Sequence, residues 1–331
     1  MRLIQYRQGD TRYVAVVEPD GSHARPLAKV ATVYELAMAA LAMEETLESL
    51  ASQLAGETAV DYAGLLAANE VLAPLDHPEP ARLHVTGTGL THTGSASARD
   101  KMHAFAKASG APESDSMKMF RMGVEGGKPG PGKIGVPPEW FYKGNGTSVV
   151  APGGALTIPG FGITGGEEPE VVGLYMIDGD GGPRRIGFCL GNEFSDHTIE
   201  AQNYLYLAHS KLRACSMGPE LLLGDLPANI KGKSRVMRAG KTVFEDDALL
   251  GEANMSHTIA NLEHHHFKYD NFRRPGDLHA HYFGAAVLSF SAGVKTQPGD
   301  EFVIEAKEFG QPLRNTLAAA DDEGLVVVKP L

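Results

Sequence analysis

The chain contains 331 residues, 43% of them hydrophobic, which allows a sizeable core in one large domain or two unequal ones. Its net charge of −11 argues against nucleic acid or an anionic membrane as a partner, because both are bound through concentrated Lys and Arg. The polar first residues and the lack of a long apolar stretch predict a cytoplasmic protein.

Local patterns predict a small α/β domain at the N-terminus. Residues 12–28 alternate apolar and polar side chains around Asp20-Gly21, which predicts a β-hairpin with a type I′ turn. Apolar residues recur at helical spacing over 32–54, and a shorter helix fits 61–68. Since a stretch rich in proline and acid follows, we expect a boundary near 74–80, between a domain over 1–75 and one over 76–331.

The larger domain shows short apolar runs broken by Gly and Pro, which predict a β-rich fold and place the whole chain in the α+β class. Residues 123–138 look too irregular for a helix or strand and are a candidate lid. Helices are expected over 198–212 and 255–270, and strands over 302–306 and 324–328.

Several familiar motifs lack a residue that they need. The phosphate-loop spacing at 127–133 is followed by Ile134, where a hydroxyl is required. The possible calcium loop that begins at Asp178 has Cys189 at its twelfth position, where a glutamate is required. The three histidines at 264–266 cannot converge on one ion from a helix, so a solvated helix surface is predicted there. The two cysteines fit neither a disulfide framework nor a zinc site.

One hairpin carries three carboxylates. The sequence from EPEVVGLYMI through DGDGGP to RRIGFCLGNEF predicts two strands joined by a tight turn. Glu168 and Glu170 are two residues apart on the first strand, so their side chains share a face. Folding at the turn brings Glu193 back opposite Glu168.

Such a cluster has two interpretations. Opposed carboxylates are tolerated when a cation neutralises them, and an all-oxygen donor set favours Mg²⁺, Mn²⁺ or Ca²⁺. Alternatively, residues 167–170 form the exposed acidic end of a hairpin in water. The charge pattern alone leaves both interpretations open.

The order of motifs around this hairpin resembles the fumarylacetoacetate hydrolase superfamily. Its usual pattern is E-x-E followed by G-x-x-x-x-N-D-x-S-x-R, and here E-x-E is followed by GNEFSDHTIE. Further similar stretches occur in the expected order: GTGLTH at 87–92, PPEWFYKGNGTSV at 137–149, YDNFRRPGD at 269–277 and PGDEFVIEAKEFGQPLRNTL at 298–317. The resemblance covers about residues 80–320 and implies a homodimer. The segment IEAQNYLYLAHSK is most similar to the 2-keto-3-deoxy-sugar-acid dehydratase branch.

The resemblance implies roles for residues at matching positions. The three glutamates become metal ligands for Mg²⁺, with Mn²⁺ or Ca²⁺ as alternatives. Lys143 and Lys211 become substrate-facing cations or proton-transfer groups, and Glu200 an acid or base. We expect Lys211 or Glu200 to transfer the protons, and Lys143 to lie over the substrate carboxylate.

The chain departs from the family pattern at several positions. Glu193 stands where the family has an aspartate, and His197 stands where it has an arginine. When protonated, His197 can take the place of that arginine. The usual Gly-Thr reads Gly284-Ala285, which removes a hydroxyl contact unless Ser289 or Ser291 supplies one. His92 lies near the position of a tyrosine or a water-activating histidine of the family, so a catalytic role and a purely structural role for His92 both stay open.

The implied function is that of a lyase, dehydrating a 2-keto-3-deoxy sugar acid in carbohydrate catabolism. A base removes the C3 proton and an acid assists loss of the C4 hydroxyl from this small anionic 2-oxo acid. One alternative is a hydrolase that cleaves a C–C bond of a 2,4-dioxo acid, with His92 activating water. Another is a noncatalytic protein that binds metal or sugar acids.

Overall fold

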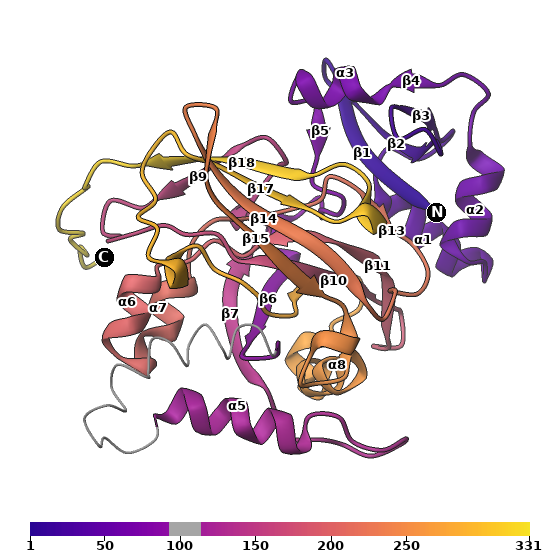
Figure 1. Ribbon diagram of the computed structural model, residues 1–331. Helices are drawn as coiled ribbons and strands as arrows, with labels where there is room; N and C mark the ends of the chain where they lie inside the picture. Colours follow the sequence, from indigo (N-terminus) through magenta and orange to yellow (C-terminus); the bar gives the residue numbers. More distant parts are fainter. Residues whose placement is uncertain (93–113) are drawn as a thin grey trace.

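Two β-sheets form the centre of the protein, whose computed structural model describes residues 1–92 and 114–331 (Figure 1). Within the described residues the larger sheet contains β1 (Arg2–Gln8), β2 (Thr11–Val17), β3 (His23–Pro26), β4 (Val60–Asp61), β5 (Val71–Leu72), β6 (Leu83–Gly89), β7 (Glu139–Asn145), β8 (Val149–Val150), β10 (Pro169–Ile177), β11 (Pro183–Asn192), β12 (Cys215–Met217), β13 (Leu221–Leu222) and β16 (Leu278–Tyr282). The smaller sheet contains β9 (Ala155–Ile158), β14 (Ile230–Arg238), β15 (Lys241–Leu250), β17 (Glu301–Glu305) and β18 (Leu313–Ala319).

Helices cover the sheets and fill the connections. The described α-helices are α1 (Val33–Met43), α2 (Leu47–Leu54), α3 (Tyr62–Ala67), α5 (Asp115–Gly126), α6 (His197–Gln202), α7 (Leu207–Lys211) and α8 (Ile259–Phe267). Short 3-10 helices are η1 (Pro80–Arg82), η2 (Gly146–Ser148), η3 (Tyr204–Tyr206), η4 (Glu252–Asn254), η5 (Asp270–Phe272), η6 (Phe290–Ala292) and η7 (Lys307–Phe309). The predicted α+β class with a β-rich body is confirmed.

β10 lies at the centre of the larger sheet, between β11 and β16. All nine of its residues are buried. Val172, Leu174 and Met176 pack into the core beneath α1 and α2, whereas Val171 belongs to the core between the two sheets. A strand covered on both faces is expected to be apolar throughout, and this explains the continuous run after Glu170.

The N-terminal hairpin forms as predicted, but its turn differs. β2 and β3 pair antiparallel with Val17 opposite Ala24. Gly21 has a positive φ of 69°, but Asp20 is not in the left-handed region that a type I′ turn also requires there. Instead, Asp20 Oδ1 accepts hydrogen bonds from the amides of Ser22 at 2.9 Å and His23 at 3.1 Å. The predicted type I′ turn is therefore wrong.

The helix predicted over 32–54 is two helices. α1 ends where Glu44 adopts the left-handed conformation with φ 55°, and Thr46 then caps α2 by accepting from the amide of Ser49. The helix expected over 61–68 is confirmed as α3, with Asp61 as its N-cap. Apolar periodicity does not report such a break, because both helices bury side chains in the same core.

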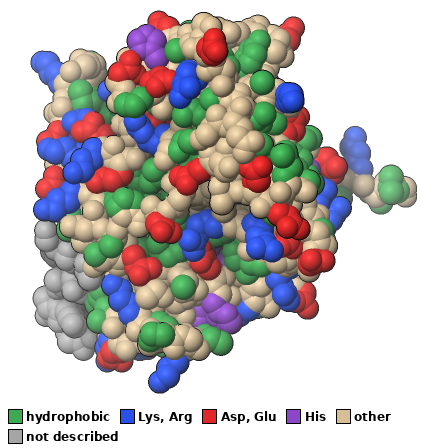
Figure 2. All heavy atoms as spheres, turned by 90° about the vertical axis from the view of Figure 1, so that its right-hand side faces the viewer, with side chains coloured by type: hydrophobic (Ala, Val, Ile, Leu, Met, Phe, Trp, Pro, Cys, Tyr) green, Lys and Arg blue, Asp and Glu red, His purple; other side chains and the backbone are tan. Residues whose placement is uncertain are grey.

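The N-terminal elements share the larger sheet with the rest of the chain. β1 pairs with β13 through Leu3 opposite Leu221, and Arg2 forms an ion pair with buried Glu220 at 2.8 Å. The division of the chain at residue 75 stays a prediction. Figure 2 shows acidic and basic side chains interspersed over the face on which these N-terminal elements lie.

Four predicted segments in the larger domain differ from the structure. Residues 123–126 belong to α5 rather than to a loop, and residues 255–270 form only the shorter α8, capped by Thr258. Residues 198–212 are divided into α6, η3 and α7, because Asn203 is extended with φ −161° and ψ 132°. Residues 324–328 form no strand, since no strand among the described residues pairs with them, and Val326 is 81% exposed. The strand expected over 302–306 is confirmed as β17, shifted by one residue.

The predicted solvated surface at 264–266 is confirmed for His264 but wrong for its two neighbours. His265 and His266 are buried, and His266 lies in a histidine cluster with His84, His279 and His281. The partners come from β6, far away in sequence, and from β16, which follows soon after α8, so helical spacing alone could not identify them. No helix of the described residues is long and apolar enough to cross a membrane.

Candidate active site

The hairpin of β10 and β11 brings three carboxylates together. Pro169 pairs with Asn192, and the amide of Glu193 donates to the carbonyl of Glu168 at 3.0 Å. Oxygen atoms of Glu168, Glu170 and Glu193 all lie within 4.8 Å of one another. All three side chains are buried, with at most 7% residue exposure. The predicted juxtaposition is confirmed, and the alternative of an exposed acidic hairpin end is wrong.

Lys211 joins this cluster from α7. Its Nζ donates to Glu193 Oε2 at 2.7 Å and to Ser195 Oγ at 3.1 Å, and also contacts Glu168 Oε1 closely. Glu200 Oε2 lies 3.9 Å away from the same nitrogen. One ammonium group therefore stands among three carboxylates.

Lys143 approaches Glu193 from the other side. Its Nζ forms an ion pair with Glu193 Oε1 at 2.6 Å, and donates to the carbonyls of Phe194 at 2.8 Å and Lys211 at 2.9 Å. The residue is fully buried on β7. These contacts fit a role in holding Glu193, while the predicted role over the substrate carboxylate stays a prediction.

Glu170 retains an acceptor without a hydrogen bond. Its Oε2 accepts from the amide of Gly284 at 2.6 Å, whereas Oε1 has no hydrogen-bond partner among the described residues and is shielded from solvent. Gly284 has a φ of 97°, and a Cβ there would collide with Thr91 Oγ1, so this approach requires glycine. A buried anionic oxygen in this state is a ready ligand for a cation.

Burial and charge separate the pKa values of these groups. Burial raises the pKa of Glu170 well above its usual range, and the charges of Glu193 and Glu168 add to this effect. Burial also raises the pKa of Glu193. For Glu168, burial alone would raise the pKa, but the charge of Lys211 and the hydrogen bond with His197 hold that pKa well below the usual range.

Lys211 is an ammonium in this arrangement. Burial alone would lower its pKa, but the charges of Glu168, Glu193 and Glu200 raise the pKa well above the usual range. A charged lysine serves as a proton donor or as an electrostatic partner rather than as a base.

The charge balance supports a divalent cation. If all four carboxylates, Glu168, Glu170, Glu193 and Glu200, were ionised, they would exceed the two ammonium groups by two negative charges, a state that the raised pKa values of Glu170 and Glu193 oppose without a cation. A divalent cation neutralises that excess and uses the free oxygen of Glu170. Because all the donors are carboxylate oxygens, Mg²⁺, Mn²⁺ or Ca²⁺ fits better than Zn²⁺.

Two residues that the sequence analysis did not single out build the turn before α6. Ser195 lies between Lys211 and the oxygen of Glu193, as a hydrogen-bond partner of both. Asp196 caps α6 by accepting from the amide of Ile199 at 3.1 Å. Asp196 could have been recognised as an N-cap, because short polar residues commonly precede a helix. The contact of Ser195 with Lys211 depends on the tertiary fold and could not.

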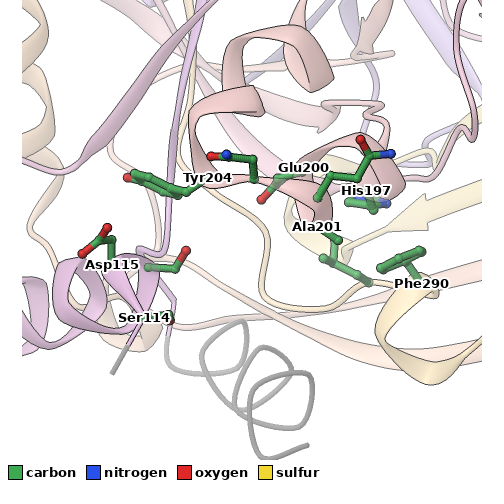
Figure 3. Close-up of a pocket in the computed structure, with 11 residues that line it drawn as sticks. Ser114, Asp115, His197, Glu200, Ala201, Tyr204 and Phe290 are labelled. Atoms are coloured by element: carbon green, nitrogen blue, oxygen red, sulfur yellow. The ribbon is translucent and has the colours of Figure 1, made fainter. Parts of the chain in front are cut away.

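α6 presents its residues to a cavity of about 460 Å³. His197 Nε2 lies 3.1 Å from Glu168 Oε1, and its ring packs against Phe290 with centroids 5.2 Å apart. Figure 3 shows Glu200 and His197 on one side of this cavity, with Ser114 and Asp115 of α5 facing them. The cavity therefore lies between α6 and the start of α5, and it borders the carboxylate cluster only through His197 and Glu200.

Comparisons with known proteins show related sequences. No family model matches the chain. A probable 2-keto-3-deoxyxylonate dehydratase of Haloferax volcanii is 30% identical over 114 residues, covering 33% of this chain and 38% of that protein. A 2-dehydro-3-deoxy-D-arabinonate dehydratase of Saccharolobus solfataricus is 29% identical over 115 residues, covering 33% and 37%. The chain thus matches less than two fifths of the length of either relative.

Two structures of 2-keto-3-deoxy-D-arabinonate dehydratase match almost the whole chain. The apo form has a TM-score of 0.71 at 18% identity, covering 97% of this chain and 99% of its own. The complex with magnesium and 2,5-dioxopentanoate has a TM-score of 0.70 at 18% identity, covering 97% and 100%. This chain has the fumarylacetoacetate hydrolase fold. It is distantly related to the 2-keto-3-deoxy sugar acid dehydratases.

Within this fumarylacetoacetate hydrolase fold, the predicted site residues gather around Lys211, except for His92. His92 is buried, and burial together with the charge of Lys128 lowers its pKa to about 4. Its Nδ1 lies 3.1 Å from Thr91 Oγ1, which donates to the carbonyl of Phe283. The structure thus links His92 to the segment before Gly284, and its catalytic role stays a prediction.

Proposed function

We propose that this protein is a divalent-metal-dependent hydro-lyase that dehydrates a 2-keto-3-deoxy sugar acid. The observation that carries this proposal is the meeting of Lys211 and Glu200 beside three buried carboxylates, with Glu200 lining an adjacent cavity. The names of the two curated relatives support the reaction class. Binding of magnesium and 2,5-dioxopentanoate by the structural relative supports the substrate class.

Glu168, Glu170 and Glu193 would hold the cation. When bound, it supplies Lewis-acid polarisation to a chelating 2-oxo acid and makes the C3 proton more acidic. Lys143 and Ser195 keep Glu193 in position through the ion pair and the hydrogen bond described above. The protein thus provides a rigid carboxylate set, which limits reorganisation during the reaction.

Proton transfer falls to Glu200 and Lys211. Glu200 lines the cavity with its side chain 14% exposed, so it can reach a substrate that fills this space. We assign it removal of the C3 proton. Lys211, charged and 3.9 Å from Glu200, then donates a proton to the departing C4 hydroxyl, which leaves as water. The C3–H and C4–O bonds break, and the carbon skeleton stays intact.

A substrate screen tests the proposal directly. The protein with Mg²⁺ should convert 2-keto-3-deoxypentonates to a product that has lost one water and no carbon, as measured by mass spectrometry. Two carbon fragments from a 2,4-dioxo acid, without dehydration of the sugar acids, would overturn it in favour of a hydrolase. Metal binding without turnover of either class would overturn it in favour of a binding protein.

A further inference from the structure

Glu167 is a buried carboxylate next to the proposed metal ligand Glu168, and the chemistry assigned above does not use it. It is fully buried, and both of its oxygens accept hydrogen bonds from one residue, Ser289. The amide donates to Oε1 at 2.8 Å and the hydroxyl donates to Oε2 at 2.7 Å. Glu168 instead contacts Lys211 and His197. The adjacent carboxylates of Glu167 and Glu168 thus lie in two different environments.

Ser289 anchors the turn that leads into η6. Its carbonyl accepts from the amides of Ala292 at 3.0 Å and Val294 at 3.1 Å, while its amide and hydroxyl are both bound to Glu167. Every polar group of Ser289 therefore has a partner. The next residue, Phe290, has its place determined by this anchor, because only one peptide unit separates them.

Phe290 and His197 together form a wall between two cavities. Their ring planes differ by 31°, and Figure 3 shows the two rings side by side. Both residues line the cavity of about 460 Å³ that contains Glu200. Both also line a second cavity of about 530 Å³, which is bordered by Thr164 and Lys295. Displacement of Phe290 would connect these spaces and leave the ring of His197 without support.

We infer that Glu167 is a positioning residue for the active site, holding Phe290 against His197 through its paired hydrogen bonds with Ser289. The effect on catalysis rests on the proposed function, whereas the effect on the ring contact does not. A buried carboxylate that only stabilised the fold would affect unfolding without changing the environment of the His197 ring. The two roles therefore differ in measurable ways.

The first experiment observes the ring contact without turnover. In protein labelled with ¹³C-histidine and supplied with Mg²⁺, the ring signal of His197 is assigned from its absence in His197→Asn. Phe290→Ala removes the ring current and defines the full shift of that signal. Glu167→Ala and Ser289→Ala should each reproduce most of this shift, and Glu167→Gln, which keeps both hydrogen-bonding positions, should not.

Ser291→Ala is the matched control. It removes a hydroxyl from the same loop, and Ser291 Oγ makes no hydrogen bond to the described residues. It should leave the His197 signal in place. If Glu167→Ala does not fold, Ser289→Ala breaks the same contact from the other partner. An unchanged His197 signal in a folded Ser289→Ala or Glu167→Ala variant would overturn the inference.

Kinetics provides the second measurement. Ser289→Ala should raise KM about tenfold with little change in kcat, the size expected for losing one hydrogen bond to a charged group. The double variant Ser289→Ala/Phe290→Ala should have the KM of Phe290→Ala alone, since both changes act through one ring. Fully additive effects would contradict this. Should the wild-type protein turn over no sugar acid, the proposed function fails while the His197 signal still decides the role of Glu167.

Discussion

Two buried clusters of titratable side chains lie in this protein, and they differ in how their polar groups are satisfied. The carboxylate cluster of Glu168, Glu170 and Glu193 would carry excess negative charge when fully ionised, and it contains a carboxylate oxygen without a hydrogen-bond partner among the described residues. The histidine cluster joins donors to acceptors: Trp140 Nε1 donates to His266 Nδ1 at 3.3 Å, and His266 Nε2 lies 3.0 Å from Nδ1 of His279.

The difference concerns charge more than burial. Burial lowers the pKa of His266 and His279 well below the usual range, with neighbouring histidines adding to the effect, so these rings are neutral at pH 7. Ring nitrogens of His279 and His281 also lack hydrogen bonds among the described residues, but a neutral ring loses far less on burial than an ion does. Uncompensated charge, rather than a concentration of titratable groups, therefore identifies the site for a cation.

The largest effect is expected for Glu170→Gln, which removes a charge and an anionic donor but keeps the shape. Mg²⁺ affinity should fall more than about 100-fold, because even indirect metal contacts are worth 10–100-fold, and turnover should be lost. The metal-free protein should be at least as stable as wild type, since a neutral amide avoids the burial of charge and the repulsion by Glu193 and Glu168 that raise the pKa of Glu170. Calorimetric Mg²⁺ titration and denaturant unfolding measure both, and unchanged affinity would refute the metal site.

Glu200→Gln should separate chemistry from metal binding. We expect kcat to fall by about 10²–10⁴, the usual contribution of a general base, with Mg²⁺ affinity close to that of wild type because Glu200 is not one of the three proposed ligands. Glu263→Gln is a control, since Glu263 pairs with Arg185 away from the site. Steady-state kinetics with saturating Mg²⁺ gives the answer, and an unaffected kcat would remove Glu200 from the mechanism.

The histidine cluster predicts a loss of stability in acid. An unfolded histidine takes up a proton near pH 6.5, whereas burial lowers the pKa of His281 to about 3. Between these values the unfolded chain binds more protons, so the free energy of unfolding falls as the pH falls, by about 1.4 kcal/mol per pH unit for one such residue. His281→Asn should reduce this slope between pH 6 and 4 in urea titrations. An identical slope would show that His281 titrates normally in the folded protein.

The smallest effect is expected for Trp140→Phe. It removes the donor to His266 and should lower the free energy of unfolding by about 1–2 kcal/mol, in the range of one buried hydrogen bond with some lost packing. Metal affinity and kcat should stay at wild-type values. A clear fall in kcat in the folded variant would mean that the histidine cluster takes part in catalysis. The two clusters would then not differ in function as proposed.

The sequence predicted the carboxylate cluster because the information needed was local. Side-chain alternation placed Glu168 and Glu170 on one face, and the short turn placed the returning strand so that Glu193 comes back near Glu168, although a register shift between Leu174 and Tyr175 adjusts the pairing. The family resemblance added Lys211 and Glu200, which the structure brings within 3.9 Å of each other. The roles of these residues in catalysis stay predictions.

Features that depend on distant segments could not be predicted in this way. The burial of His266 depends on β6 and β16, and the pairing of Glu167 with Ser289 joins residues 122 positions apart. The helix breaks at Glu44 and Asn203 are local, but each depends on the backbone conformation of one residue inside an apolar repeat. Periodicity reports which face is buried and does not report where a helix ends.

The pairing of β1 with β13 has a consequence for synthesis in the cell. Leu3 leaves the ribosome early, while its strand partner Leu221 is made roughly 200 residues later. At translation rates of about 5–20 residues per second, Arg2 and Leu3 therefore wait on the order of ten seconds or more for β13, whereas Gln5 and Tyr6 can pair with β5 much earlier. During this interval the nascent chain exposes unpaired backbone groups that other chains can bind, and a chaperone that shields the N-terminal hairpin would raise the yield of folded protein.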